Sequence, residues 1–441
     1  MRKESETSEL LLDPSLHVRA EMNWYQRTFS KMNRDSLRGS IFIMLLTALG
    51  TGVFTLHHLF NKIGIVYAIL LIIIIGGCFG LTSDMLTHAL SRKPGCQSMG
   101  DLNTQVLGRA AFAVYNVLVF IYIMLCLIAN MSSMSKIIYL NFETLIWQII
   151  GTAKENQTFE HFNRYFAYVL GLLLLFLVGQ RDIENLRYFT LYSFFIFVFI
   201  ICVFVVQAPL YISDLASRGQ AKYNFTAISF HGLFSSFGCL LFAYNAIVNF
   251  YTVVGTVQNP TTRRLKKIFF RTFGILGLTF IVVGLIAYLC FGAEHSMSVD
   301  LFIFREKIGE SDVLMIIGRS LLIVSLATGA GINAYPLKMM LLQVMKLENC
   351  FKVNIAMSVA IVMVCTLVAS LFSSVTNYVA FAGSFCATLM VFTYPCLIGL
   401  KTRYCAKWHT KAMLVGFMVA MTALGLASSY VSLLEFFDKS K

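Results

Sequence analysis

The sequence predicts an all-α integral membrane protein of about eleven transmembrane helices. Of its 441 residues, 58% are hydrophobic and 13% are charged, whereas roughly one-quarter of the residues in soluble domains are charged. Apolar runs of about 20 residues, the length needed to cross a hydrocarbon core roughly 30 Å thick, recur along the chain. Both observations indicate that lipid surrounds most of this protein.

The apolar runs divide the chain into a polar tail and one long membrane domain. They lie near residues 39–60, 63–88, 111–140, 165–180, 185–212, 228–254, 268–292, 313–337, 353–373, 375–400 and 411–434. We expect a disordered cytosolic tail over residues 1–37, a transmembrane domain over 38–435 and a short extracytosolic end over 436–441. The loops are too short for a further soluble domain of about 50 residues.

The positive charges predict the orientation of the helices. A net charge of +13 would suit nucleic-acid binding if the Lys and Arg residues covered one soluble face, but they lie between apolar runs, so we expect no nucleic-acid partner. With the N-terminus in the cytosol, 24 Lys and Arg residues fall in inner segments and nine in outer ones. Short cytoplasmic loops carry such an excess. We therefore expect a cytosolic N-terminus, and an odd number of crossings places the C-terminus on the other side.

The first apolar run carries an unusual central stretch, Gly50, Thr51 and Gly52. Glycine destabilises a helix interior, and unwound backbone is tolerated at membrane depth only where protein covers it or it lines a site. Transporters use such breaks to bind ions and the carboxylate or ammonium groups of substrates. Close helix packing through the two glycines would explain the same residues.

The sixth run has aromatic and polar residues near its midpoint, Phe242, Tyr244 and Asn245. Many transporters consist of two inverted repeats, so with five helices in each half, a break in the first helix predicts a break in the sixth. The aromatic rings and the amide would suit a small zwitterion. The alternative is a helix packed through Gly238, with Asn245 hydrogen-bonded to a neighbour.

Four segments carry further motifs, namely Ala48–Leu56 with Lys62–Gly64, Gln180–Arg187, Tyr335–Lys338, and Phe381–Ser384 with Thr393–Pro395. These segments resemble the amino acid/auxin permease family, whose members have the LeuT-type fold. They correspond to the family's Gly-x-Gly signature in helix one, its short basic connector between helices four and five, and its patterns in helices eight and ten. His57 stands where the family usually has proline. The resemblance covers nearly the whole chain, since the segments run from the first to the tenth helix.

The resemblance implies a LeuT-like five-plus-five inverted repeat with broken helices one and six, plus one extra helix. It also implies a substrate held at mid-membrane by backbone atoms of the first break and side chains of the sixth helix, namely Gly50, Thr51, Gly52, Phe242, Tyr244 and Asn245. In sodium-coupled relatives an ion lies between helices one and eight, where Ser325 and Thr328 are the candidate ligands here. Both hydroxyls could equally bond carbonyls of their own helix.

These features predict a secondary active transporter that moves amino acids by alternating access, coupled to H⁺ or Na⁺ and without another cofactor. An amino-acid-binding sensor with little flux would have the same site. An enzyme is not expected, because the sequence has no zinc pair, no intramembrane carboxylate pair and no nucleophile beside a histidine. The helix breaks favour alternating access over a channel.

The remaining expectations concern partners and location. We expect a monomer with amino acids as substrates and membrane lipids as its surroundings. The membrane is the plasma membrane or an endosomal, lysosomal or vacuolar one. The tail segment Glu6–Leu11 matches an acidic dileucine sorting pattern, although an ordinary disordered tail explains it too.

Overall fold

The computed structural model confirms the predicted architecture. It describes residues 37–93, 95–96, 98–150, 159–180, 187–219, 221–226, 229–244, 247–255, 257, 260–295, 313–371 and 375–438. Eight helices of this described part are long and apolar enough to cross a membrane, and shorter apolar helices cover Tyr168–Val178 and Phe230–Tyr244. The predicted tail over residues 1–37 lies outside the described residues except for its last one, and the C-terminal end is described only as far as Asp438.

The first and sixth crossings are broken, as predicted. The first consists of α4 (Leu37–Ala48), a 3-10 turn η1 (Thr51–Thr55) and α5 (Leu56–Ile63). The sixth consists of α11 (Phe230–Tyr244), a 3-10 turn η4 (Ile247–Asn249) and α12 (Phe250–Gly255). Residues 245–246, between α11 and η4, lie outside the described part.

The other crossings are long helices, apart from the tenth. They are α6 (Ile65–Arg92), α8 (Arg109–Ile150), α9 (Phe159–Val178), α10 (Arg187–Ser217), α13 (Thr262–His295), α14 (Val313–Met345), α15 (Phe351–Leu371) and α18 (Trp408–Asp438). The tenth crossing joins α16 (Val375–Phe381), the π-helical segments η6 (Ala382–Ala387) and η7 (Leu389–Thr393), and α17 (Tyr394–Lys401). A short helix α7 (Met99–Val106) precedes α8.

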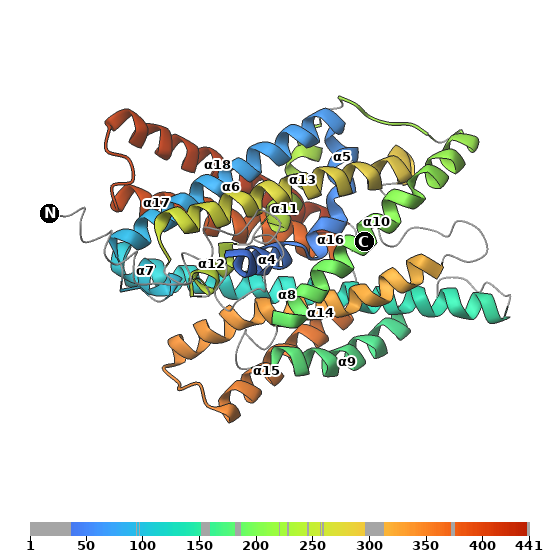
Figure 1. Ribbon diagram of the computed structural model, residues 1–441, viewed down its shortest axis with the longest axis horizontal. Helices are drawn as coiled ribbons and strands as arrows, with labels where there is room; N and C mark the ends of the chain where they lie inside the picture. Colours follow the sequence, from blue (N-terminus) through green and yellow to red (C-terminus); the bar gives the residue numbers. More distant parts are fainter. Residues whose placement is uncertain are drawn as a thin grey trace, which may run out of the picture.

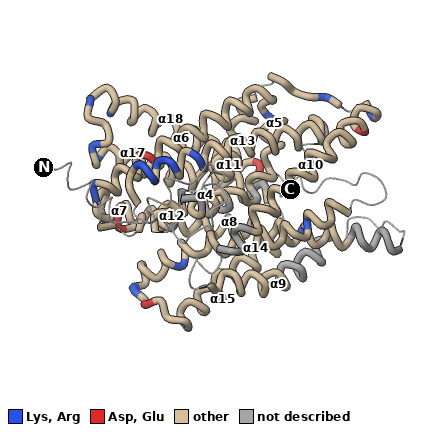
Figure 2. The backbone as a smooth tube through the Cα atoms, viewed as in Figure 1, with Lys and Arg blue, Asp and Glu red and all other residues tan. Residues whose placement is uncertain are grey.

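The helices form two groups with the first break between them. Helices α8, α9, α14 and α15 pack on one another, while α6 packs on α13 and α11 packs on α18. Figure 1 shows α9, α14 and α15 on one side of α4, and α6, α13 and α18 on the other. Figure 2 shows the Lys and Arg residues gathered mainly in loops and toward helix ends, which leaves the helix middles mostly uncharged. Lipid therefore meets an apolar surface, as membrane insertion requires.

Helix α11 and the π-helical segment η6 are in contact through their backbones. A Cβ on Gly383 would collide with the carbonyl oxygen of Gly238, and a Cβ on Gly238 would collide with that of Ala380. Small residues at membrane interfaces allow this close approach. The contact fixes the broken sixth helix against the tenth.

A buried lysine of α14 joins the end of α9 to α15 through hydrogen bonds. Lys338 in α14 is buried, and its Nζ donates to the carbonyls of Val178 at 2.5 Å and Gln180 at 2.8 Å and to Oδ1 of Asn354 at 2.9 Å. It therefore caps the C-terminal end of α9, where the last carbonyls of a helix have no partner and attract a cation.

Asp84, near the end of α6, forms an ion pair with one other element and accepts a hydrogen bond from another. Lys266 of α13 places Nζ 2.8 Å from Oδ1, and the Tyr404 hydroxyl donates to Oδ2 at 2.7 Å. Burial raises the pKa of Tyr404, and its hydrogen bond to Asp84 acts in the same direction, so the phenol stays protonated as the donor. These contacts tie α6 and α13 to the loop between α17 and α18.

Candidate functional site

A small cavity lies beside the break of the first helix. Its volume is about 20 Å³, room for roughly one water molecule. The cavity is lined by the first break and by α8, α11 and α14. The lining residues are Thr47, Ala48, Leu49, Gly50, Tyr122, Cys126, Asn130, Phe242, Ser325, Leu326, Gly329 and Asn333. A ligand larger than water requires these helices to move apart.

The two glycines of the break have different surroundings. Gly50 lines the cavity, is extended at φ −118° and ψ −152°, and has open space where a Cβ would point. A Cβ on Gly52 would lie 2.8 Å from Cδ1 of Phe242 and 2.9 Å from Cα of Ala243. Gly52 therefore permits close packing of the two broken helices, whereas Gly50 leaves room beside the cavity. The side chain of Thr51 lies outside the described part.

Three asparagines bring amide groups to the cavity or next to it. Asn130 of α8 is 3% exposed, and its Oδ1 has no hydrogen-bond partner among the described residues. Asn333 of α14 accepts a hydrogen bond from Asn249 at 3.2 Å and donates to Sγ of Cys126 at 3.5 Å. A buried acceptor without a partner costs roughly 1–3 kcal/mol. Oδ1 of Asn130 is therefore ready to accept a hydrogen bond from a ligand.

The predicted hydroxyl pair divides between two environments. Ser325 lines the cavity, and its Oγ lies 3.5 Å from the Ser193 carbonyl. Thr328 is fully buried and donates to the Val324 carbonyl of its own helix at 2.8 Å. Of the two, Ser325 faces the break of the first helix.

The predicted residues of the sixth helix also have different surroundings. Phe242 lines the cavity and packs against Tyr122, with ring centroids 5.6 Å apart. Tyr244 is fully buried and donates to the Ile72 carbonyl of α6 at 3.0 Å. Its hydroxyl occupies space left by Gly76 and Gly277, so it packs between α6 and α13 instead of lining the cavity. Asn245 lies outside the described residues.

Sequence reasoning identified Ser325 of α14 but missed other lining residues of α8 and α14, among them Tyr122, Cys126, Asn130 and Asn333. Asn130 was the detectable one, because an amide in the middle of an apolar run needs a partner or a function. No side chain described along the cavity carries a formal charge.

A scan against protein families matches residues 33–436 to the family described as transmembrane amino acid transporter protein. The chain belongs to this family. Two curated relatives, each named "Putative amino acid transporter AAT1" and coming from Plasmodium falciparum and Plasmodium berghei, are 26% identical to it over 61% of the chain. The match spans 42% and 41% of their lengths.

Solved structures show the same fold. The crystal structure of MhsT in complex with L-phenylalanine has a TM-score of 0.60 at 13% identity, covering 91% of this chain and all of the other. The manganese transporter of Eremococcus coleocola has a TM-score of 0.55 at 12% identity, covering 95% of this chain and 90% of the other. This member of the amino acid transporter family is thus a multi-pass membrane protein with a LeuT-like fold.

Proposed function

We propose that this family member is a secondary transporter that carries amino acids across a membrane by alternating access. The observation that supports it most is the cavity at the broken first helix, which backbone and uncharged side chains enclose. Backbone groups freed by a helix break can bind the ammonium and carboxylate groups of an amino acid. The apolar surround of Leu49, Phe242 and Leu326 favours substrates with uncharged side chains.

The proposed binding residues fall into two sets. Gly50, Phe242 and Asn130 line the cavity and would contact the substrate directly. Thr51 and Asn245 belong to the proposed site through their position at the two breaks. Gly52 would act by bringing the broken helices together, and Tyr244 by holding α11 against α6.

Coupling to H⁺ or Na⁺ belongs to the same proposal. Ser325 is a candidate Na⁺ ligand because it lines the cavity beside the first break. Thr328 donates its hydroxyl proton to the Val324 carbonyl, and the lone pairs of the same oxygen would serve as the second ligand. The protein would work as a monomer surrounded by lipid, with its N-terminus in the cytosol, in the plasma membrane or in an endosomal, lysosomal or vacuolar membrane.

Counterflow in liposomes tests the function. Purified protein is reconstituted, loaded with a mixture of unlabelled amino acids and offered radiolabelled ones, with a Na⁺ or a pH gradient imposed separately. We expect saturable accumulation of uncharged amino acids, increased by one of the gradients. Binding without any flux would instead favour the alternative, an amino-acid sensor with the same site.

A further inference from the structure

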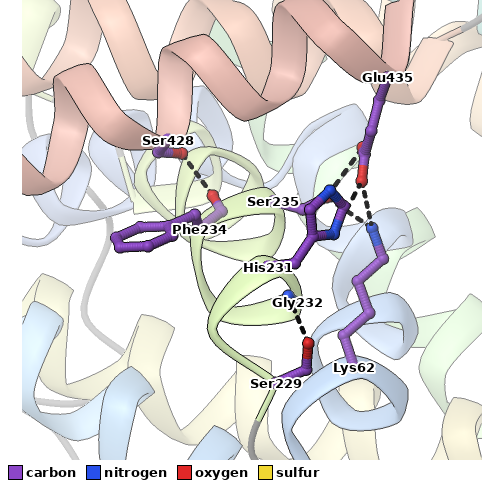
Figure 3. A network of polar contacts seen from close by, with 8 residues as sticks. All are labelled: Lys62, Ser229, His231, Gly232, Phe234, Ser235, Ser428 and Glu435. Carbon is purple, nitrogen blue, oxygen red and sulfur yellow. Dashed lines mark hydrogen bonds and ion pairs between the residues drawn. The ribbon is translucent and has the colours of Figure 1, made fainter. Parts of the chain in front are cut away.

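Glu435, near the end of α18, contacts the outer parts of both broken helices. Its Oε1 lies 3.3 Å from Nζ of Lys62 in α5 and 3.9 Å from Nδ1 of His231 in α11. Its Oε2 accepts a hydrogen bond from the Ser235 hydroxyl of α11 at 2.9 Å, and Lys62 donates to that hydroxyl at 2.5 Å. Figure 3 shows the Glu435 side chain reaching from α18 to Lys62, with His231 beside it. We call these four residues the Glu435 clasp.

The local structure places each member of the clasp. Lys62 lies in the last turn of α5, where the helix C-terminus favours a cation. His231 and Ser235 are four residues apart and therefore share one face of α11. A second contact, from the Ser428 hydroxyl to the Phe234 carbonyl at 2.5 Å, holds α18 to α11 about two turns before Glu435.

The clasp residues close one end of the molecule, the α5 face, where α5 ends and α11 begins. A Cβ on Gly232 would lie 2.8 Å from the Lys62 carbonyl, so α5 and α11 already touch there. Between this face and the cavity, Phe54 and His57 are fully buried. Any path from the α5 face to the cavity requires α5 and α11 to part.

Burial makes the clasp stronger than an ordinary surface pair. The side chains of Lys62 and Glu435 are 19% and 28% exposed, whereas those of Arg218 and Asp214, an ion pair at the end of α10, are 57% and 44% exposed. Exposed pairs contribute little, while hydrogen bonds to charged groups in partly buried positions contribute more. The Glu435 carboxylate also has both oxygens engaged, by two different helices.

We propose that Glu435 is a positioning residue of the transport cycle, which clasps the outer parts of the two broken helices together and so stabilises the state closed at the α5 face. This rests on the proposed function, because a closed state has a role only if the cavity opens to both sides. Removing the carboxylate shifts the population toward the state open at the α5 face.

Labelling of Cys126 tests the clasp, since this cysteine lines the cavity. The protein is reconstituted in liposomes with a protease site after residue 441, which follows the end of α18 at the α5 face. Cleavage by protease added outside identifies the molecules whose α5 face points out of the liposome. A membrane-impermeant thiol reagent is applied, and background from other cysteines is measured with Cys126→Ser. Glu435→Gln, which keeps the size of the side chain, is expected to speed labelling of Cys126 about fivefold or more.

Rescue and coupling separate the clasp from a general loss of structure. The charge-swapped double variant, Lys62→Glu with Glu435→Lys, is expected to restore slow labelling of Cys126. The double variant Lys62→Met with Glu435→Gln is expected to be labelled no faster than either single variant, because both changes remove the same interaction. Asp214→Asn is the matched control, because it breaks an ion pair that joins the last turn of α10 only to Arg218, the residue after the helix. It should leave the labelling rate unchanged.

Two results would overturn the proposal: labelling at the wild-type rate in Glu435→Gln, or additive effects of the two single changes. If Cys126 reacts in no variant, the second measurement is amide hydrogen exchange of residues 56–63 and 230–236. Faster exchange in Glu435→Gln than in the wild type would support the proposal, and unchanged exchange would overturn it. Neither readout needs flux, so failure of the proposed transport function would be seen separately in the counterflow assay.

Discussion

Replacing Gly383 with alanine is expected to destabilise the protein by about 3 kcal/mol or more. The added Cβ would collide with the carbonyl oxygen of Gly238, and neither backbone can yield as a flexible side chain would. The substitution therefore forces η6 and α11 apart and disturbs the broken sixth helix. The measurement is the thermal unfolding midpoint of the purified protein in detergent.

Gly416→Ala is the matched control for this change. Gly416 lies in α18, and a Cβ there would meet no atom within 4 Å. Alanine stabilises a helix more than glycine does, so the unfolding midpoint of Gly416→Ala should equal or slightly exceed that of the wild type. Equal midpoints for Gly383→Ala and Gly416→Ala would show that the close backbone contact is not present.

Gly52→Ala is expected to reduce uptake at least about tenfold and to destabilise the protein by roughly 1–3 kcal/mol. Its Cβ would lie 2.9 Å from Cα of Ala243, so η1 must move away from α11. That movement displaces the backbone of the break from the cavity. Initial uptake rates and unfolding midpoints in the same preparations check the prediction.

Gly50→Ala provides the contrast within the same motif. Its Cβ would enter open space from an extended backbone that any residue adopts. We expect the wild-type unfolding midpoint, with any change appearing in KM because Gly50 lines the cavity. If both glycine variants lowered the midpoint equally, the different roles assigned to the two glycines would be wrong.

The sequence was sufficient to predict the helices and the first break from local composition, and the inverted repeats of many transporters extended the prediction to the sixth helix. Lipid requires long apolar runs, and glycines at the centre of such a run indicate where the helix stops. The resemblance of four short segments to a transporter family then predicted the inverted repeat. The family match over residues 33–436 agrees with that reading.

The lining of the cavity could not be predicted in the same way. An apolar helix in lipid has no polar face to reveal which side chains point inward, so Tyr122 of α8 was missed. Asn130 is an amide within an apolar run, which indicates a partner or a function but does not show that it lines a cavity. Tyr244 follows Phe242 by two residues, a separation that places them on different sides of a helix, and only Phe242 lines the cavity. Lys62 and Glu435 are 373 residues apart, so their contact depends on tertiary packing alone.

The most direct test of the central claim, that an amino acid binds in the cavity at the break, is the KM for uptake by Asn130→Ala. The free Oδ1 of Asn130 is expected to accept a hydrogen bond from the substrate, so its loss should raise KM about tenfold. Asn116→Ala is the control, because Asn116 is also buried on α8 but is not among the residues described along the cavity. An unchanged KM in Asn130→Ala, equal to that of Asn116→Ala, would contradict the account.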